Sequence, residues 1–362
     1  MKDIRMILPN PASDTAGAAS LLFQLNGLTI IHDAAGSMES YITFDESREL
    51  EGKRTVASRL SRLEAITGDD GILLGKIEEA CADDNPPFIA ILGTPVPFTI
   101  GTDLEGIASE AEFITGIPAF GVNSGGFEIY DKGAGEALKK VLQKTAQPPK
   151  AHTGQIVNLL GATPMDYSPA EIADIEQILY TRGADMVRNL TMTDGMEQIY
   201  QAAEADHNLV ISVAGLSAAR YLKQKYGIPY TIGLPLEPIT DIEAASLHRV
   251  LVIGESVWAK QLAGIIRQIS GVTAVAGLTG NDDAEIFPDV DSIRLDTENS
   301  IRMELKKDYT VIIGDPMYRL LLPQNSNCIF IERPHRALSG RLYPFSEYKL
   351  NHYLDKLKEC LT

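Results

Sequence analysis

Three arginines and a histidine lie within nine residues near the end of the chain, directly after a run that is typical of a strand. Arg333, His335, Arg336 and Arg341 follow the sequence CIFIE. Guanidinium groups form paired hydrogen bonds with carboxylates and phosphates, and strand ends in open α/β sheets face the ligand crevice. We therefore expect a small anionic ligand here. The alternative is a solvated surface on which these cations pair with acidic side chains.

A glycine-containing turn after the apolar run LTIIH is a second candidate site. The sequence HDAAGSMESY, from His32 to Tyr41, predicts a buried strand that breaks into a turn. Open α/β sheets bind ligands at such positions. Asp33 after the strand is typical of a turn residue, and Ser37 is typical of a helix N-cap.

The three cysteines give no metal-ligand pattern. Cys81, Cys328 and Cys360 form no CxxC pair or similar spacing, so we expect ordinary thiols in a reducing cytoplasm. No metal ligands are predicted, and this chain alone is not expected to hold an all-cysteine cluster.

Two other motifs are incomplete: VAGLSAA ends in Ala219 where a nucleophile elbow has glycine, and VLVIGESVWAKQLAG lacks GxGxxG.

The elements that must position these residues alternate between strands and helices along the whole chain. Helices of ten or more residues between short apolar strands imply parallel sheets. We predict an α/β protein of three Rossmann-like, doubly wound domains around an interdomain cleft. The predicted boundaries are 1–150, 151–248 and 249–362, the last domain including a C-terminal helix. Within them MEQIYQAAEAD and TDIEAASLH are predicted to be helices, and KRTVASRLSR (53–62) an exposed helix face or docking surface.

Composition restricts the classes of partner. The 362 residues carry a formal net charge of −17, which argues against nucleic acid or an anionic membrane surface as partner. No apolar run approaches the roughly 20 residues of a membrane span, and the N-terminus lacks a signal-peptide core. We expect a cytoplasmic protein.

Several segments, in matching order, resemble nitrogenase component 1. The turn HDAAGSMESY is similar to the family's HGPxGCxxY turn, whose cysteine holds an iron–sulfur cluster; Ser37 stands there. SDTAGAASLLFQLNGLTIIH resembles the CxxxGA segment, with fifteen residues from Gly17 to His32 as in the family, and Ser13 at the cysteine position. TPVPFTIGTDLEGI resembles STCPxGLIGDDIEAV, which places Pro95 at the third cluster cysteine. VNSGGFE resembles VNCEGF.

The resemblance extends to the segments that hold the family's active-site cofactor. NLVISVAGLSAARYLKQKYGIPY is similar to NVVxCxRSxxYxxxxMEEKYGIPW, which places Ser212 at the cysteine ligand. PHRALSGRLYPF resembles the segment of the histidine ligand, with Tyr343 at that position and His335 about one position from a different family histidine. The resemblance also retains residues that shape the backbone: Gly17, Gly36, Gly101, Asp103, Glu105, Gly227, Pro229, Ser339 and Gly340.

The resemblance implies a divergent subunit of a cytoplasmic oxidoreductase complex for electron transfer. Serine and proline are poor iron ligands, so the metal centre would come from a paralogous partner, with an ATP-dependent iron–sulfur reductase supplying electrons. In a related reductase of chlorophyll synthesis an aspartate replaces one cluster cysteine, so Ser37, with Asp33 or Asp14, could share a cluster with a partner.

The alternative is a non-catalytic binding or scaffold protein. It would hold a tetrapyrrole, a metallocluster or an anionic metabolite in the interdomain cleft. Besides the basic residues, Ser212 and Asn123 are the candidates to contact such a ligand, and Ser13, Ser37 and Tyr343 mark the inherited cofactor positions. The oligomeric state follows from neither alternative, and both a homo-oligomer and a hetero-oligomer remain open.

Overall fold

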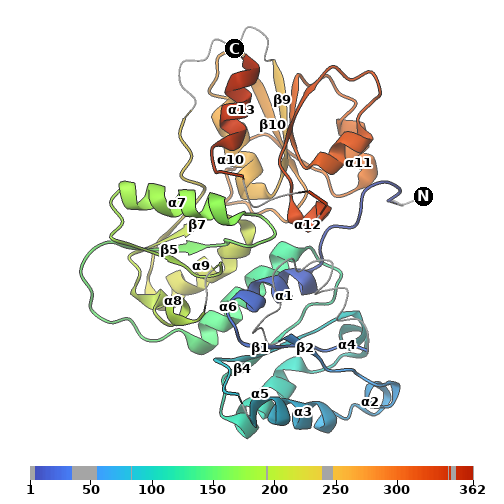
Figure 1. Ribbon diagram of the computed structural model, residues 1–362, viewed down its shortest axis with the longest axis vertical. Coiled ribbons are helices and arrows are strands. Elements are labelled where there is room, and N and C mark those ends of the chain that lie inside the picture. The colour runs from blue at the N-terminus through green and yellow to red at the C-terminus, as the bar shows by residue number, and fades with distance from the viewer. Residues whose placement is uncertain are drawn as a thin grey trace.

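The computed structural model describes residues 5–34, 55–82, 84–192, 195–238, 248–340, 342–343 and 348–361. In this part of the chain three parallel sheets, each with its own helices, form three Rossmann-like domains. Figure 1 shows the first domain at the bottom, the second at the left and the third at the top. The prediction of an α/β fold with three parallel-sheet domains is confirmed. The boundaries at 150 and 248 stay predictions; the sheets lie within 28–122, 156–232 and 249–332.

The first domain has a four-stranded sheet in the order β2-β1-β3-β4, with every pair parallel. Its elements are α1 (Asp14–Gln24), β1 (Leu28–Ile31), β2 (Thr55–Ala57), α2 (Arg62–Thr67), α3 (Gly71–Ala82), β3 (Ile89–Leu92), α4 (Pro95–Ile100), α5 (Leu104–Thr115), β4 (Ala119–Val122) and α6 (Tyr130–Thr145). The strands β1, β3 and β4 are buried throughout, as expected for apolar strands covered on both faces.

The second domain has a four-stranded parallel sheet in the order β6-β5-β7-β8. Its elements are β5 (Ile156–Leu160), α7 (Pro169–Thr181), β6 (Met186–Asn189), α8 (Glu197–Tyr200), the 3-10 helix η2 (Ala202–Glu204), β7 (His207–Val210), α9 (Val213–Tyr226) and β8 (Tyr230–Ile232). Helix α7 begins with Pro169 in its first turn and a capping box between Ser168 and Glu171, which satisfies the free N–H groups at a helix start.

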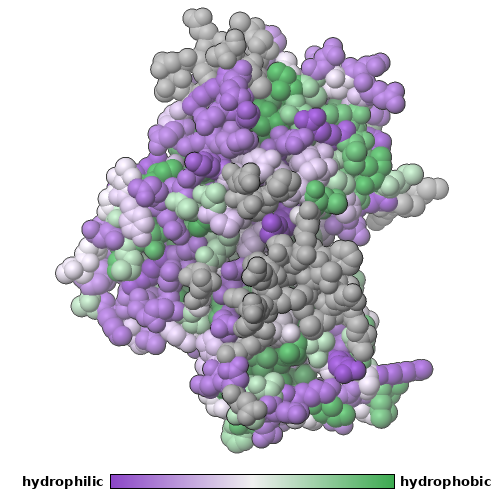
Figure 2. All heavy atoms as spheres, in the orientation of Figure 1, coloured by the Kyte–Doolittle hydropathy of each residue, from purple (hydrophilic) through white to green (hydrophobic). Residues whose placement is uncertain are grey.

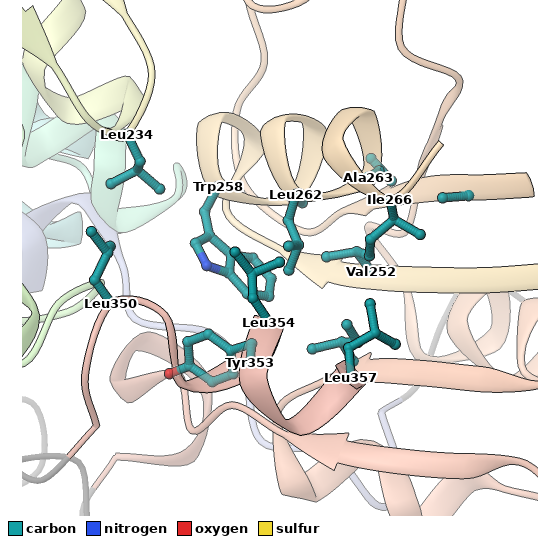
Figure 3. Close-up of a cluster of buried hydrophobic side chains, with 14 of the residues drawn as sticks. Leu234, Val252, Trp258, Leu262, Ala263, Ile266, Leu350, Tyr353, Leu354 and Leu357 are labelled. Atoms are coloured by element: carbon teal, nitrogen blue, oxygen red, sulfur yellow. The ribbon is translucent and has the colours of Figure 1, made fainter. Parts of the chain in front are cut away.

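The third domain has a five-stranded parallel sheet in the order β11-β10-β9-β12-β13. Its elements are β9 (Arg249–Gly254), α10 (Ser256–Ile266), β10 (Thr273–Leu278), β11 (Ser292–Arg294), α11 (Glu298–Glu304), β12 (Val311–Gly314), the 3-10 helix η3 (Pro316–Leu321), β13 (Ile329–Glu332), α12 (Arg336–Ser339) and α13 (His352–Leu361). Figure 3 shows α13 packing on α10 through Tyr353, Leu354 and Leu357, which face Trp258 and Leu262.

Two local expectations were wrong. Residues 55–61 of the run 53–62 do not form a helix, because Thr55–Ala57 forms the edge strand β2 and pairs with β1; β-branched Thr55 and Val56 favour the extended backbone. The alternative expectation for this run, a docking surface, stays a prediction. The helix expected in MEQIYQAAEAD is reduced to the four residues of α8 and the 3-10 turn η2. The helix expected in TDIEAASLH lies almost wholly outside the described residues.

Two glycines allow α1 and α6 to pack backbone against backbone in the centre of the molecule (Figure 1). A Cβ on Gly17 would lie 2.0 Å from the Tyr130 carbonyl oxygen, and a Cβ on Gly133 would lie 1.8 Å from the Asp14 carbonyl oxygen. Any side chain at either position would force the helices apart. This contact fixes the start of α1 beside the start of α6, where all three domains meet.

Candidate functional site

The carboxyl ends of β1, β3 and β4 form the edge that carries the predicted cluster positions. Side-chain hydroxyls tie the strand ends together: Thr94 donates to the His32 carbonyl oxygen at 2.9 Å, and Ser124 donates to the Gly93 carbonyl oxygen at 2.8 Å. We call this group of strand ends, with the start of α1, the cluster edge. Its hydroxyl groups satisfy buried backbone acceptors, which is the usual role of buried polar side chains.

Asp14 is the central polar side chain of the cluster edge. It is buried, and its carboxylate accepts hydrogen bonds from the backbone N–H groups of Thr15 at 3.0 Å, Gly125 at 3.0 Å and Gly126 at 2.8 Å. One carboxylate therefore joins α1 to the loop that follows β4. Because three backbone N–H groups already donate to the Asp14 carboxylate, we interpret Asp14 as a structural hydrogen-bond acceptor.

The predicted ligands at this edge do not fit an iron–sulfur cluster held by this chain. Ser13 is the N-cap of α1, and its hydroxyl accepts from Ala16 N at 3.3 Å. Pro95 begins α4 and offers no donor atom; its ring lies against Gly126. Cluster irons are held by thiolates, and neither position supplies one. Ser37 lies outside the described residues.

Ser212 and Tyr343, at the predicted cofactor-ligand positions, also contact protein groups. The buried Ser212 hydroxyl donates to the Gly161 carbonyl oxygen at 2.6 Å, and the following Val213 N–H donates to Glu255 at 2.9 Å. The Tyr343 hydroxyl lies 3.9 Å from Met317 Sδ, within an apolar cluster of the third domain. Neither side chain has the soft sulfur or imidazole donor that such a cofactor requires.

Arg333 is enclosed between the second and third domains. Only 2% of it is exposed, and its guanidinium lies over the rings of Trp258 at 4.2 Å and Tyr353 at 5.6 Å. Its Nη2 donates to the Asp166 carbonyl oxygen at 2.8 Å and lies 3.7 Å from Glu171. Burial and the Arg333 charge act in opposite directions on Glu171; burial prevails, and the pKa of this carboxyl is raised.

His335 joins the three domains. Its Nε2 lies 3.0 Å from Oδ1 of Asp166 and 3.2 Å from the hydroxyl of Tyr130, and that hydroxyl donates to the same Asp166 oxygen. The His335 backbone N–H donates to Asp315 at 2.7 Å. Burial and the nearby Asp166 hold the pKa of Tyr130 well above its usual range, so the phenol stays protonated as a hydrogen-bond donor.

The remaining basic residues of the predicted site are described only in part. Arg336 begins α12 and is half-buried, and Arg341 lies outside the described residues. Two of the four basic residues, Arg333 and His335, thus meet carboxylates at domain junctions. These two cations meet acidic groups, as the alternative states, but both are buried and not on a solvated surface. The predicted anionic ligand stays a prediction.

The structure contains a cavity between the three domains, where the sequence predicted an interdomain cleft. It has a volume of about 910 Å³ and lies where the cluster edge, α6, the start of α9 and the loop after β10 meet. Of the described residues that the sequence analysis named as ligand contacts, Asn123 and Asp14 line it. The other polar lining residues include Asp131, Ser217, Arg220, Asn281 and Asp283. Ligand sites of 300–1,000 Å³ at domain junctions are common. Asp131 and Asp283 follow no motif, so the sequence held no signal for them.

Burial raises the pKa of two carboxyl groups near this junction. Asp131 is 1% exposed, and burial raises the pKa of its carboxyl even though Asn281 donates to it. Glu255, the N-cap of α10, is buried beside Asp166, and burial followed by that charge raises its pKa to about 8. Among the described residues no three His, Cys, Asp or Glu side chains are grouped to hold a metal ion. None of the described helices is long and apolar enough to cross a membrane.

Comparison with known proteins identifies the family. The family model for nitrogenase component 1 type oxidoreductases matches residues 13–240. Nitrogenase iron-molybdenum cofactor biosynthesis protein NifE of Bradyrhizobium diazoefficiens is 28% identical over 183 residues, covering 48% of this chain and 32% of that protein. The NifE protein of a Nostoc species is 29% identical over 177 residues, covering 47% and 36%. The matched segments thus span about a third of the length of these relatives.

Solved structures agree in fold. A structure of nitrogenase Cp1 at pH 6.5 superposes with a TM-score of 0.77, at 12% identity, covering 99% of this chain and 93% of that chain. Nitrogenase Cp1 at pH 5 gives a TM-score of 0.69 at 14% identity, covering 100% and 89%. At these identities the superpositions show the shared three-domain architecture.

Proposed function

Because the chain belongs to the nitrogenase component 1 type oxidoreductases, we propose that it is a subunit of a cytoplasmic nitrogenase-like complex that supplies architecture while a paralogous partner holds the metal centre. An ATP-dependent iron–sulfur reductase would deliver electrons to the pair. This chain would contribute the cluster edge, the central cavity and a docking surface.

One observation supports the proposal above the others: the cluster edge is intact as protein structure but has no thiolate at its described positions. Ser13 and Pro95 occupy two cluster positions, and Asp14 ties the edge together through backbone N–H groups. A chain that keeps the frame of a cluster site and lacks the ligands fits a half-site beside a ligand-bearing partner.

Exposed apolar side chains on α4 supply a docking surface next to this edge. Val96 is 43% exposed and Ile100 49%, and these two side chains, four residues apart in the helix that Pro95 begins, lie on one face. Figure 2 shows hydrophobic surface on the first domain, at the bottom of the view. Adjacent apolar side chains at a surface mark interaction sites, so we assign α4 to the contact with the partner.

The relatives support a role in an assembly that handles metallocofactors. The matching curated proteins are cofactor biosynthesis proteins of nitrogenase. We infer that this chain acts in a related assembly that handles a metallocofactor. The reaction or cargo of that assembly would be determined by the partner subunit.

The second candidate is a binding or scaffold protein, and the cavity of about 910 Å³ favours it. Under this alternative a ligand would occupy the cavity without reaction. The anionic metabolite expected from the basic residues would instead contact Arg336 and Arg341; replacing both by alanine should then weaken its binding by about 1.5–3 kcal/mol per lost charged hydrogen bond, without unfolding the chain.

The experiment is anaerobic purification of the chain alone and together with a cysteine-bearing paralogue, followed by iron and sulfide analysis and visible absorbance. We expect a colourless isolated chain and a brown complex. Val96→Asp should weaken the complex at least tenfold, whereas Phe113→Asp on α5, a side chain 89% exposed, serves as the matched control. A brown isolated chain with about four irons and a thiolate charge-transfer band would overturn the proposal, as would the absence of any complex.

A further inference from the structure

The cavity has walls from all three domains. The loop after β4 and one face of α6 come from the first domain, the start of α9 comes from the second, and residues 281–283 come from the third. These segments are separated by up to about 270 residues in sequence, as from Asp14 to Asp283. A ligand in this cavity therefore contacts all three domains at once.

One wall is apolar and includes two aromatic rings. Phe98 and Phe127 lie with ring centroids 5.7 Å apart, and Phe127 is 69% exposed. Val122, Val213 and Leu216 continue the apolar lining. Aromatic and aliphatic side chains exposed inside a cavity gain free energy when an apolar ligand covers them.

The polar lining is acidic, and its cations are already paired. Six carboxylate side chains line the cavity with the cations of Lys132 and Arg220, and two of these carboxylates, Asp282 and Glu136, pair with Lys260 and Lys139 outside the lining. Lys132 lies 2.7 Å from Glu128, and Arg220 lies 2.9 Å from Asp283 and 2.6 Å from Glu285. An incoming anion would have to displace these pairs and would meet an excess of negative charge.

Asp131 gives this acidic lining a specific anchor. Its carboxylate is 1% exposed, and its side-chain oxygens accept from the Asn281 backbone N–H at 2.7 Å and from the Asn281 side-chain amide. The structure records no ion pair between Asp131 and a cation in the described part of the chain. A buried carboxylate without an opposite charge is unfavourable, and burial raises the pKa of Asp131. A cation in the cavity would relieve this cost.

The carboxylates are not arranged for a metal ion. Asp14 accepts three backbone N–H groups, Asp282 lies 2.9 Å from Lys260, and Asp283 pairs with Arg220. In the described ranges no group of three possible metal ligands occurs. One buried carboxylate, Asp131, beside an apolar wall suits an organic cation, whose charge is carried on an apolar body.

We propose that the cavity is a binding site for an organic amine, with its apolar body against Phe98 and Phe127 and its protonated nitrogen on the side of Asp131 and Asp283. This site does not depend on whether the chain joins a metal-bearing partner, so the two proposals can fail separately.

The test uses three probes that share one apolar body: 4,4-diphenylbutylamine, 4,4-diphenylbutanol and 4,4-diphenylbutanoate. Their binding to the full chain is measured by isothermal titration calorimetry at pH 7 and at two salt concentrations. We expect the amine to bind at least tenfold more tightly than the carboxylate, with the alcohol between them. Added salt should weaken binding of the amine and leave binding of the alcohol nearly unchanged.

Paired variants locate the site. Phe127→Ala and Glu136→Gln change lining side chains that are largely or partly exposed, so both variants should fold. Each variant should bind the amine at least threefold more weakly. Phe113→Ala and Glu110→Gln, exposed side chains of α5 outside the lining, should leave it unchanged. Equal or tighter binding of the carboxylate, equal effects of the paired variants, or no binding of any probe would overturn the proposal.

Discussion

His335 of the third domain places its Nε2 3.0 Å from Oδ1 of Asp166 in the second domain, across 169 residues of sequence. Tyr130 of the first domain donates to the same oxygen. One buried carboxylate of the second domain therefore accepts from side chains of the first and third domains. Because buried hydrogen bonds require defined geometry, this junction helps to fix how the domains lie around the cavity.

Removal of the shared acceptor should be costly. Asp166→Ala leaves Tyr130 and His335 buried without their partner, and we expect a loss of about 3–5 kcal/mol in the free energy of unfolding. Tyr130→Phe removes a single hydrogen bond and should cost about 1–2 kcal/mol. Urea denaturation of both variants measures the difference. Equal losses in the two variants would contradict the shared role of Asp166.

Arg333 should behave as a structural residue. Arg333→Ala removes the contact with Trp258 and leaves the buried Glu171 without its cation, so we expect about 3–5 kcal/mol of destabilisation. The double variant Arg333→Met with Glu171→Gln should lose less free energy of unfolding than the sum of the losses in the two single variants. If Arg333→Ala instead keeps full stability and only weakens binding of a carboxylate ligand, the original prediction of an anion site holds.

The N-terminal segment should detach at low pH. Glu298 accepts from the backbone N–H groups of Met6, Ile7 and Leu8, each at 2.9 Å. Desolvation raises the pKa of Glu298, but these hydrogen bonds outweigh it and hold the pKa at about 2, below its ordinary 4.5. A lowered pKa stabilises the folded chain above pH 4.5, and this contribution is lost as the pH falls towards 2.

Hydrogen exchange of residues 6–8 between pH 5 and pH 2.5 checks this linkage. We expect protection to fall in the wild-type chain across this range after correction for intrinsic exchange. Glu298→Gln should have low protection at both pH values, because the charged acceptor is absent. An unchanged wild-type protection profile would contradict the assignment.

Asp14 should hold the cluster edge together without metal. Asp14→Ala leaves the N–H groups of Thr15, Gly125 and Gly126 without their acceptor, and we expect about 2–4 kcal/mol of destabilisation. Glu128→Gln, an exposed carboxylate of the same loop, should change stability by less than about 0.5 kcal/mol. Thermal unfolding after exhaustive chelation tests the metal-free role. A chelator-induced loss of stability in the wild-type chain would contradict it.

Much of the fold was predictable from local sequence. The alternation of short apolar strands with longer helices predicted parallel sheets, and strands such as β3 (Ile89–Leu92) and β9 (Arg249–Gly254) are largely buried. Gly227, one of the retained backbone residues, ends α9 in a left-handed conformation. These features were readable because strand burial and helix capping depend on residues close in sequence. The strand β2 was missed because three residues are too few for a periodic pattern.

The sequence by itself determined the residue types at the inherited ligand positions and hence that Ser13, Pro95 and Ser212 offer no thiolate. Only the tertiary structure decided which groups meet: the Asp14 carboxylate accepts from the loop after β4, Arg333 lies between aromatic rings, and Phe127 and Asp283 line one cavity. The reason is physical, because the environment of a side chain is set by segments hundreds of residues apart, and their approach depends on backbone packing such as that of Gly17 on α6.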